Sequence, residues 1–447
     1  MAVQAEPSTA TRIIRRTPAP AQSVTTDLVV LGAGISGVSA ALEAARLGRD
    51  VILVDGLPTL GGQAVNSIIG TFAGLYANGQ NGHQLTRGIA DDIIAALGPQ
   101  GGLRWRHGPP HTTLLYDEIM LSRWVEETVR AAGIRVLLGA VLGEVTRDGG
   151  RITGADFATR YGPVRIRATG WVDATGDAAL AWAAGFACRE AEAPSWGSQM
   201  VVLENVNEAA HPTRAELAER QHAKAPEYGM IRRDGFAFLF EGRGIALVNM
   251  THTETPLEPF AAAKSALEGK AQADRAVRFL KAEYPEAYAK ARVRTYGMPG
   301  IRQTRWIAGG HHLTVEEVRA GTKFPDAVAR TAWAIELHSH AEGYIWQPFP
   351  PDHLHYVPFR SLVPAEADNL VAAGRCIDAD NAALSSVRVM GPCIAMGAAA
   401  AHALDIAGSG SVRQIDPAAL RARIAPNVDA ADGPRPFEQD GMRKAAA

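Results

Sequence analysis

The segment DLVVLGAGISGVSAALEAARLGRDVILVD, residues 27–55, determines the expected fold of the chain. Its first apolar run, 28–31, predicts a buried parallel strand, and its second, 51–54, predicts another. The small residues between them, 36–47, predict a helix that packs closely on these strands. The sequence therefore predicts a β–α–β unit near the start of the chain.

The first strand is followed by three glycines at G-x-G-x-x-G spacing, namely Gly32, Gly34 and Gly37. The first permits a tight turn, the second lets backbone N–H groups approach a diphosphate, and the third lets the helix pack against the strand. The helix N-terminus at Ile35 and Ser36 carries partial positive charge, which suits an anion. Asp55 ends the second strand, where a carboxylate can accept a hydrogen bond from a ribose hydroxyl. These features predict a dinucleotide site and do not by themselves distinguish NAD from FAD.

Composition limits the other possibilities. A chain of 447 residues is long enough for two packed domains, and its formal net charge of −2 gives no electrostatic case for binding nucleic acid or an anionic membrane. The three cysteines are far apart and form no C-x-x-C pair, which fits a reducing compartment and a cytoplasmic protein. No apolar signal region follows the basic residues of the first 25, and the apolar stretch 389–406 is interrupted by His402 and Asp405. We therefore expect no membrane span.

Changes of character along the chain predict the domains. We expect flexible tails at 1–25 and 427–447, a discontinuous dinucleotide-binding domain over 26–187 and 356–426, and an inserted α+β substrate or cap domain over 188–355. Within them we expect a short strand at 171–172 and a largely helical segment over 386–407. The expected fold class is α/β, with a Rossmann-like domain and this insertion.

Four later segments carry glycine-rich turns that suit the same ligand. Glycines in LGGQ let backbone lie against a flat ring or a phosphate, and a strand ending in Ala-Thr-Gly places a tight turn beside the first strand. A third segment delivers a Gly-Arg turn and an aspartate for a polyol hydroxyl, and a fourth opens a helix whose N–H groups suit an anionic ring. The residues singled out are Gly61, Gly62 and Gln63; Ala174, Thr175, Gly176 and Asp177; Gly374, Arg375 and Asp378; and Val389, Met390 and Gly391.

Taken in order, these pieces make the chain resemble the FAD-dependent oxidoreductase family of glutathione-reductase-like flavoproteins. The resemblance rests on VVLGAGISGVSAALEAARLG, LPTLGGQA, GWVDATGDAALAWAAG, GIRQTRWIAGGHHLTVEEV and the long segment from Tyr356 to Ala403, and it covers most of residues 26–407. It implies tightly bound FAD in a glutathione-reductase-type domain, with the inserted domain covering the flavin, and it adds Gly56 and Val145 to the cofactor contacts. Two residues depart from the family pattern: Asp55 stands where glutamate is commoner, and Val65 where threonine is frequent.

Candidates for chemistry come from the inserted segment. Arg302 and Arg305 suit a carboxylate, because guanidinium groups bind it through two parallel hydrogen bonds. His338 is the candidate for taking or giving the proton that accompanies hydride transfer. The H-x-H pairs at 338–340 and 353–355 lack further ligands at telling spacing, so we expect no metal site.

The expected function is that of a dehydrogenase or oxidase, which transfers hydride between a small polar organic substrate and flavin N5. A carboxylate is the candidate substrate class. No second G-x-G-x-x-G unit with flanking strands is evident, so the electron donor or acceptor stays open. Two alternatives remain: a reduced-flavin enzyme that acts on a double bond with or without net redox change, and a non-catalytic FAD-bound electron-transfer or scaffold protein. Homo-oligomerisation is also open.

Overall fold

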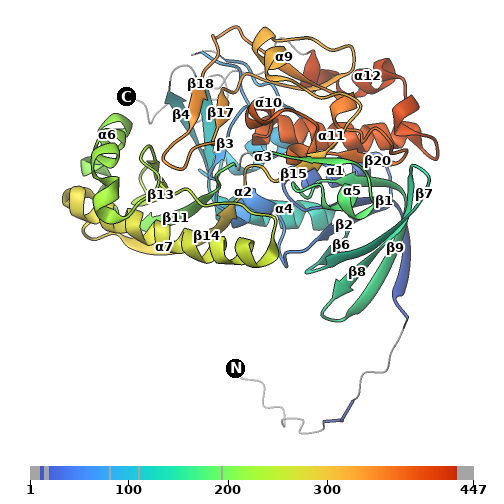
Figure 1. Ribbon diagram of the computed structural model, residues 1–447, viewed down its shortest axis with the longest axis horizontal. Helices are drawn as coiled ribbons and strands as arrows, with labels where there is room; N and C mark the ends of the chain where they lie inside the picture. Colours follow the sequence, from blue (N-terminus) through green and yellow to red (C-terminus); the bar gives the residue numbers. More distant parts are fainter. Residues whose placement is uncertain (1–10, 15–19, 80–81, 109–110, 193–194, 430–447) are drawn as a thin grey trace.

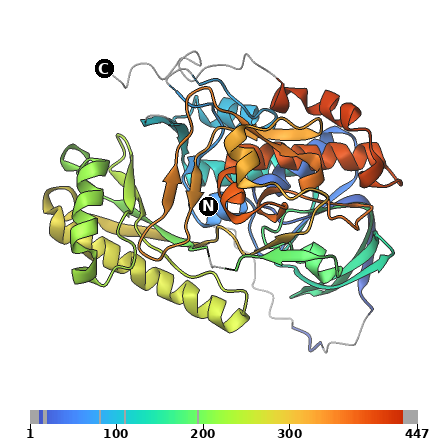
Figure 2. The ribbon, with the colours of Figure 1, turned by 45° about the horizontal axis from the view of Figure 1, so that its top comes forward.

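The computed structural model describes residues 11–14, 20–79, 82–108, 111–192 and 195–429. The molecule has two lobes side by side, as Figures 1 and 2 show. One lobe is built on a largely parallel sheet and the other on a smaller antiparallel sheet. The architecture is thus a mixed α/β fold with a parallel-strand sheet, as the sequence predicts.

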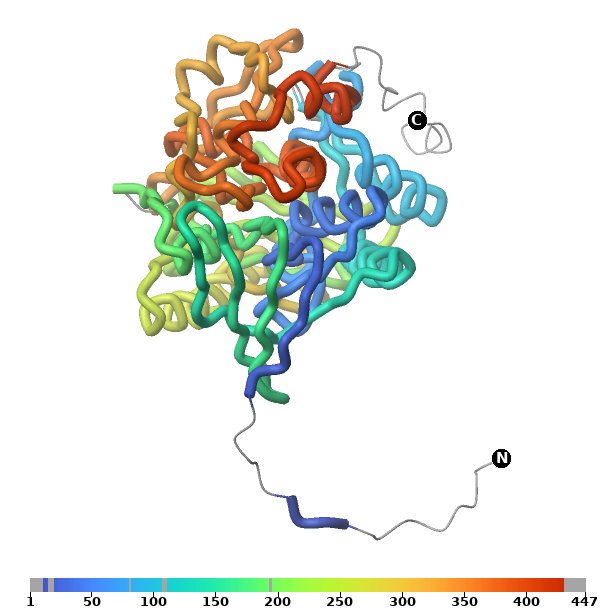
Figure 3. Tube along the Cα trace, turned by 90° about the vertical axis from the view of Figure 1, so that its right-hand side faces the viewer, coloured from blue at the N-terminus to red at the C-terminus, as the bar shows by residue number. Residues whose placement is uncertain are grey.

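The larger sheet has the strand order β6-β2-β1-β9-β8-β7, and β20 pairs with the end of β9. Its strands are β1 (Gln22–Leu31), β2 (Val51–Asp55), β6 (Arg135–Leu138), β7 (Val141–Asp148), β8 (Arg151–Thr159), β9 (Gly162–Asp173) and β20 (Leu370–Ala372). Neighbours among β6, β2, β1, β9 and β20 are parallel, whereas β7, β8 and β9 pair antiparallel. Figure 3 shows β1 beside β9. The turns that follow β1, β9 and β20 therefore meet at one edge of the sheet, where ligands of open α/β sheets bind.

Alternate residues of the parallel strands enter two different cores, because successive strand side chains point to opposite faces. Leu28 and Val30 pack with four helices, which are α1 (Ile35–Arg46), α4 (Glu118–Ala131), α11 (Met390–Ala407) and α12 (Pro417–Val428). Val29 and Leu31 pack instead with β7, β8 and α5 (Ala179–Ala183). The sheet is thus covered on both faces, which explains its continuous apolar runs.

The second lobe is a four-stranded antiparallel sheet of order β12-β13-β11-β14. Its elements are β11 (Ser198–Glu204), α6 (Arg214–Lys224), β12 (Phe236–Phe240), β13 (Ile245–Asn249), α7 (Pro259–Glu283), α8 (Pro285–Tyr288) and β14 (Arg292–Gly300). Val201 and Val248 face α7, while Met200 and Phe238 face Ile68 of the first lobe. This second face is the one that lies toward the site described below.

Short elements fill the space between the lobes and the last helices. They are α2 (Gly62–Asn66), β3 (Thr71–Phe72), α3 (Ile89–Leu97), β4 (Leu103–Gly108), β5 (His111–Tyr116), β10 (Cys188–Glu190), β15 (Arg305–Ile307), α9 (Val315–Ala320), β16 (Ala327–Thr331), β17 (Ile335–Leu337), β18 (Ile345–Gln347), β19 (His355–Pro358) and α10 (Asn381–Val387). The strands among them form a three-stranded sheet, β3-β5-β4, and three two-stranded sheets.

Four expected boundaries differ in the structure. Residues 22–25 belong to β1 rather than to a tail, because they pair with 164–167 of β9, and Trp171–Val172 is the end of β9 rather than a separate strand. The helical segment 386–407 is two helices, since Val389 is extended (ψ 164°) and α11 starts just before Pro392, a residue that suits only the first helical turn. α12 continues to Val428. The rest of the predicted tails, 1–10, 15–19 and 430–447, lies outside the described residues.

The hydrophobic cores bear on the predicted division into domains. The core of the second lobe draws on residues from Val201 to Ala291. Trp306, Leu313 and Phe349, which the prediction assigns to the insertion 188–355, pack in the core of the first lobe. The domain division remains a prediction, and the cores indicate a narrower second lobe.

One described helix, α11, is long and apolar enough to cross a membrane by length and composition, and 78% of its apolar window is buried inside the protein. It packs tightly on α1. The Ser39 hydroxyl donates to the carbonyl of Ile394 (2.8 Å), and a Cβ at Gly397 would lie 2.1 Å from the Ser36 carbonyl. Core packing therefore accounts for its composition, in line with the expected absence of a membrane span.

Candidate functional site

A cavity of about 650 Å³ runs from the carboxyl edge of the parallel sheet to the inner face of the second lobe. Its first part is lined by the glycine-rich turns, and its second part by arginine and aromatic side chains. The sequence-predicted residues that line it are Gly32, Gly34, Ile35, Ser36, Asp55, Gly62, Gln63, Ala174, Thr175, Gly176, Asp177, Arg302, Arg375, Val389 and Met390. Segments more than 350 residues apart in sequence thus share one cavity.

The turn after β1 has the geometry that the glycine spacing predicts. Gly32 has φ +100°, and a Cβ there would lie 2.3 Å from the Ala174 carbonyl oxygen. A Cβ at Gly37 would lie 1.8 Å from the Gly32 carbonyl, so only glycine lets α1 start this close to β1. Gly61 donates its N–H to the Ala33 carbonyl (2.8 Å), which lays the 61–62 turn over the first glycine turn. The free N–H groups at the start of α1 therefore open into the cavity.

Asp55 lies at this end of the cavity and already accepts two backbone hydrogen bonds. Its Oδ2 accepts from Ala33 N–H (2.6 Å) and its Oδ1 from Leu57 N–H (2.8 Å). Each carboxylate oxygen can accept a further hydrogen bond, so both remain available to a ribose. The short aspartate side chain thus also ties the end of β2 to the turn after β1.

Arg375 provides a positive charge beside these turns. Its guanidinium lies against Gly176, where a Cβ would come within 2.1 Å of Nη2, and its Nη1 is 3.7 Å from Asp177 Oδ1. Nη1 is buried and makes no hydrogen bond with the described residues. Gly374, at φ +76°, lets this turn approach α1, because a Cβ would lie 2.5 Å from Ser36 Oγ. The arrangement leaves a largely buried cation at the cavity wall, beside the Ala-Thr-Gly turn.

A residue that the sequence analysis did not single out builds the neighbouring turn. Asp173 accepts hydrogen bonds from the N–H groups of Leu180 and Ala181 through Oδ2 (3.0 Å each) and from the Thr175 hydroxyl through Oδ1 (2.7 Å). Burial raises the pKa of its carboxyl, while the hydrogen bonds from Ala181 and Thr175 lower it. Asp173 therefore holds the Ala-Thr-Gly turn from inside the protein, and the turn itself lines the cavity.

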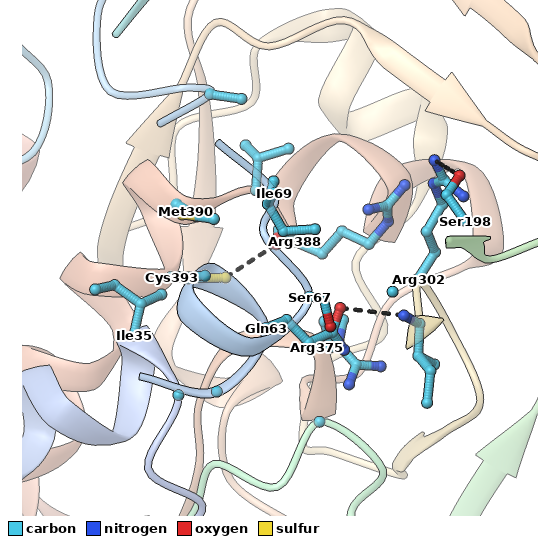
Figure 4. A pocket seen from close by; sticks show the side chains of 18 of the residues that line it. Ile35, Gln63, Ser67, Ile69, Ser198, Arg302, Arg375, Arg388, Met390 and Cys393 are labelled. Atoms are coloured by element: carbon cyan, nitrogen blue, oxygen red, sulfur yellow. Dashed lines mark hydrogen bonds between the residues drawn. The ribbon is translucent and has the colours of Figure 1, made fainter. Parts of the chain in front are cut away.

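The start of α11 forms the middle of the cavity wall, as Figure 4 shows. Gly391, in the first turn of α11, packs closely on the chain at Gly74, where an added Cβ would lie 2.3 Å from the Gly74 carbonyl oxygen. The Cys393 thiol donates to the Arg388 carbonyl (3.1 Å), and burial raises the pKa of this thiol to about 11, so it is not a thiolate at neutral pH. The Arg388 side chain extends toward Arg302. Backbone N–H groups and two arginines thus face the same space.

The far part of the cavity is strongly cationic. Four arginines line it, and they are Arg106, Arg214, Arg302 and Arg388. Burial lowers the pKa of Arg302 to about 9 and those of Arg106 and Arg388 to about 10, with neighbouring arginines adding to the shifts for Arg302 and Arg106. All three remain charged at neutral pH. This part of the cavity therefore favours an anion.

Aromatic rings complete this chamber. The ring of Phe236 lies 4.7 Å from that of Phe238, and the guanidinium groups of Arg214 and Arg106 lie over them at 5.0 and 4.3 Å respectively. Trp333, Tyr344 and Trp346 also line the chamber. Flat faces and cations together suit a planar or carboxylated organic molecule.

Glu336 is the acid of this chamber. Its Oε2 accepts from Trp333 Nε1 (3.0 Å), and its Oε1 lies 3.1 Å from His338 Nε2. The His338 side chain is fully buried and stacks on Tyr344 (4.8 Å), whereas Glu336 lines the cavity. Burial, with Arg302 and Arg232 nearby, lowers the pKa of His338 far below its usual range.

Several predicted residues lie outside the cavity lining, and four of them need correction. Asp378 is buried against Arg189 Nε (3.0 Å), His312 Nδ1 (2.7 Å) and Gly309 N–H (2.8 Å), so its carboxylate is already paired instead of facing a polyol. Arg305 bonds Glu190 (3.2 Å) and lies over Trp182 (4.3 Å), away from the chamber.

The other two corrections concern Val145 and His338. Val145, in β7, pairs with Ala155 of β8 and packs against the core beneath the sheet. His338 does not line the cavity, so Glu336 is the member of that pair positioned to exchange a proton there. Four of the predicted glycines shape the cavity walls without lining the cavity, namely Gly37, Gly61, Gly374 and Gly391. Gly56 is exposed, and a Cβ added there would lie 3.9 Å from the Ala140 carbonyl oxygen.

Sequence reasoning did not find Arg106, Arg214, Glu336 or the aromatic walls. One signal was present: Phe236-Ala-Phe238 alternates on a strand, which puts both rings on one face. Glu336 lies on β17, two residues before His338, but the sequence pattern pointed to the histidine. Nothing local marked Arg106 and Arg214, because they reach the chamber from β4 and α6.

The donor set fits a dinucleotide with a flat ring. The unpaired Nη1 of Arg375 and the free N–H groups of α1 suit its diphosphate, Asp55 suits its ribose, and the start of α11 suits its ring. Among the described residues, no group of three His, Cys, Asp or Glu side chains could hold a metal ion. The fold and the cavity thus define a nucleotide-cofactor enzyme.

Comparison with known proteins identifies the family. The profile of the FAD dependent oxidoreductase family matches residues 27–424, so the chain belongs to this family. It is an FAD-dependent oxidoreductase, and FAD is its cofactor. A search of curated protein sequences gave no match.

Solved structures similar to this chain include several flavoenzymes. A geranylgeranyl bacteriochlorophyll reductase-like protein from Thermoplasma acidophilum has 13% identity and a TM-score of 0.45, covering 91% of this chain and 80% of that chain. The flavin-dependent brominase Bmp2, as a triple mutant, has 13% identity and a TM-score of 0.46 (90% and 84%). The p-nitrophenol 4-monooxygenase PnpA from Pseudomonas putida DLL-E4 has 11% identity and a TM-score of 0.46 (90% and 81%).

Proposed function

We propose that the protein transfers hydride between a small organic anion, with a carboxylate as the first candidate, and the flavin. The observation that carries this proposal is the continuity of one cavity from the glycine turns after β1 to the four-arginine chamber. When FAD is bound, it supplies the two-electron chemistry at N5. The chain's own side chains then have to bind, orient and handle a proton.

Arg302 is the residue best placed to anchor the substrate. Its Nη1 donates to the Trp196 carbonyl (2.6 Å) and its Nη2 to Ser198 Oγ (3.0 Å), so its guanidinium is fixed rather than mobile. A fixed cation costs little to order when an anion binds. Arg388 comes from the opposite wall, so the pair can hold an anion between the two lobes.

The aromatic walls set the shape of the substrate. Phe236, Phe238 and Trp333 offer flat apolar surfaces in the same chamber as the cations. We expect an unsaturated or aromatic acid to bind better than a compact inorganic anion, because it buries apolar surface as well as charge.

Two alternatives are separable from this proposal. A reduced-flavin enzyme acting on a double bond would use the same chamber in the reductive direction. A non-catalytic electron-transfer or scaffold protein would have no need for a buried acid and four arginines in one cavity. The chamber therefore favours an enzyme over a scaffold.

Anaerobic mixing tests the proposal. The FAD-loaded protein, in oxidised form and after chemical reduction, is mixed with a panel of small carboxylic acids while the flavin absorbance is followed. Bleaching of the oxidised flavin identifies a dehydrogenase, and reoxidation of the reduced flavin identifies a reductase. If no member of the panel changes either spectrum, the proposed function is wrong.

A further inference from the structure

Hydrogen-bond directions in a buried row of side chains place a proton at the wall of the chamber. The row runs from the Ala341 carbonyl through His252 and His338 to Glu336. Each link joins two heavy atoms within 3.1 Å or less, and each therefore requires one hydrogen.

The first link fixes the tautomer of His252. Its Nδ1 lies 2.8 Å from the Ala341 carbonyl oxygen, which can only accept, so Nδ1 carries the hydrogen. Burial and the nearby Arg232 and Arg302 lower the pKa of His252, so its ring is neutral. Its Nε2 then has a lone pair and accepts.

The second link follows from the first. His338 Nδ1 lies 2.9 Å from His252 Nε2, so His338 must be the donor and carry its hydrogen on Nδ1. A neutral His338 then has a lone pair on Nε2, which faces Glu336 Oε1 at 3.1 Å. The hydrogen of this third link belongs to a carboxylic acid at Glu336, or equivalently to an imidazolium at His338 beside a carboxylate.

The other oxygen of Glu336 agrees with this direction. Oε2 accepts from Trp333 Nε1 (3.0 Å), as the carbonyl oxygen of a carboxylic acid does, which leaves Oε1 as the hydroxyl. Of the two partners, only Glu336 lines the cavity, with 20% of its side chain exposed against 0% for His338. The shared proton therefore reaches the chamber through Glu336.

We propose that Glu336 is the proton donor of the site, with His338 and His252 as the positioning residues that keep its proton in place. This inference rests on the proposed function. When hydride is added to one atom of a substrate double bond, Glu336 Oε1 gives its proton to the neighbouring atom, the electron pair of the O–H bond stays on the carboxylate, and the reduced product leaves. Bound FAD in its reduced form would supply the hydride, and solvent would restore the proton to Glu336.

Charged neighbours stabilise the carboxylate that this transfer leaves. The titratable and charged groups around the Glu336–His338 pair are Arg302, Arg388, Arg232, His111, Tyr344 and His252. Arg388 also donates from Nη2 to the backbone carbonyl of Glu336 (3.3 Å), and its buried Nε makes no hydrogen bond with the described residues. These cations therefore favour release of the proton that Glu336 holds.

The tautomers can be tested without turnover. Nitrogen-15 NMR of labelled histidines in the FAD-loaded protein should show His252 and His338 both protonated at Nδ1, and Glu336→Gln should keep this pattern, because the amide N–H₂ can donate to His338 Nε2 in place of the acid. A neutral His338 protonated at Nε2, with Nδ1 bare, would reverse both links that His338 makes and overturn the proposal.

Turnover tests the role of the proton. Glu336→Gln should retain FAD and thermal stability but slow the reaction of the reduced flavin with the reactive panel acid by about 10²–10⁴-fold, while Glu342→Gln, the same change at an exposed position, should stay within about twofold. His338→Gln should shift the pH optimum of this reaction to a lower pH, so that lowering the pH restores the rate. An unchanged rate in Glu336→Gln overturns the role of Glu336 as proton donor but not the proposed hydride transfer. If no acid of the panel reacts, the proposed hydride transfer is wrong, while the NMR result remains valid.

Discussion

Arg375 has a buried guanidinium nitrogen without a hydrogen-bond partner among the described residues, a costly state unless a ligand completes it. We predict that Arg375→Met weakens FAD binding, because it removes a charge-assisted hydrogen bond worth about 1.5–3 kcal/mol, or about 10- to 150-fold in Kd. Fluorescence titration of the apoprotein with FAD measures this. Arg167→Met, which loses an arginine bonded to the Ser23 hydroxyl far from the cavity, serves as the control. Equal affinities of the two variants would contradict the assignment.

The sequence suggests the same role for Arg302 and Arg305, but in the structure only Arg302 of the two lines the cavity. We predict that Arg302→Met raises KM for an acidic substrate by about tenfold or more, since it removes a fixed cation from the chamber, while Arg305→Met leaves KM within about twofold. Arg302→Lys should recover part of the affinity by restoring the charge. Steady-state kinetics of the three variants check this, and a larger effect at Arg305 would contradict the geometry.

The sequence identified those residues whose role depends on the backbone conformation of a short segment. Gly32, Gly37 and Gly176 are required by backbone geometry that a short motif encodes. Asp378 and His338 were misplaced because an aspartate after a glycine turn or a histidine after a strand has several possible partners, and only the folded chain selects among them.

At the scale of elements, α1 depends on contact between two glycines. A Cβ at Gly37 would lie 1.8 Å from the Gly32 carbonyl, so Gly37→Ala must push α1 away from β1. We predict a loss of stability of about 1–3 kcal/mol, typical of overpacking, together with weaker FAD binding. Gly310→Ala is the control, because its Cβ would meet only ordinary contacts at 3.5 Å or more. Thermal unfolding of both apoproteins measures the difference, and similar midpoints would refute the packing argument.

Elements were predicted well where apolar periodicity was strong. α1 and β2 lie within one residue of the ranges expected for them, 36–47 and 51–54, because their patterns reflect burial directly. The break between α10 and α11 was not predicted. The break depends on Val389, whose extended backbone lets the Arg388 side chain enter the cavity. No local sequence pattern predicts that contact.

At the scale of the whole molecule, buried neutral histidines should make stability depend on pH. Burial lowers the pKa of His355 to about 3 and that of His111 to about 4, whereas both would titrate near 6.5 in the unfolded chain. The unfolded state therefore binds more protons between about pH 6.5 and these values, so stability is lost as pH falls, by up to about 1.4 kcal/mol per pH unit for each histidine.

His355→Gln tests this dependence. We predict that its thermal midpoint falls less between pH 7 and pH 5 than that of the parent protein, because one proton-binding difference is gone. His222→Gln, at an exposed histidine, should fall as the parent does. Differential scanning calorimetry at the two pH values gives the answer, and parallel behaviour of all three proteins would contradict it.

The sequence predicted the glycine-rich turns that line one end of the cavity but not the side chains that line the other end. The turns after β1, β9 and β20 come together because parallel strands end at one edge, a rule that holds for any such sheet. The chamber instead joins side chains from β4, α6, β12, the 301–304 segment and the start of α11, whose meeting depends on how the lobes pack.

In the proposed function, one cavity holds both FAD and an organic anion. The most direct measurement is the anaerobic single-turnover rate of the flavin with the reactive panel acid and with its neutral amide at equal concentration. We predict that the amide reacts at least about a hundredfold more slowly, because it cannot engage the arginines through two charge-assisted hydrogen bonds. Equal rates for the acid and the amide would contradict the account.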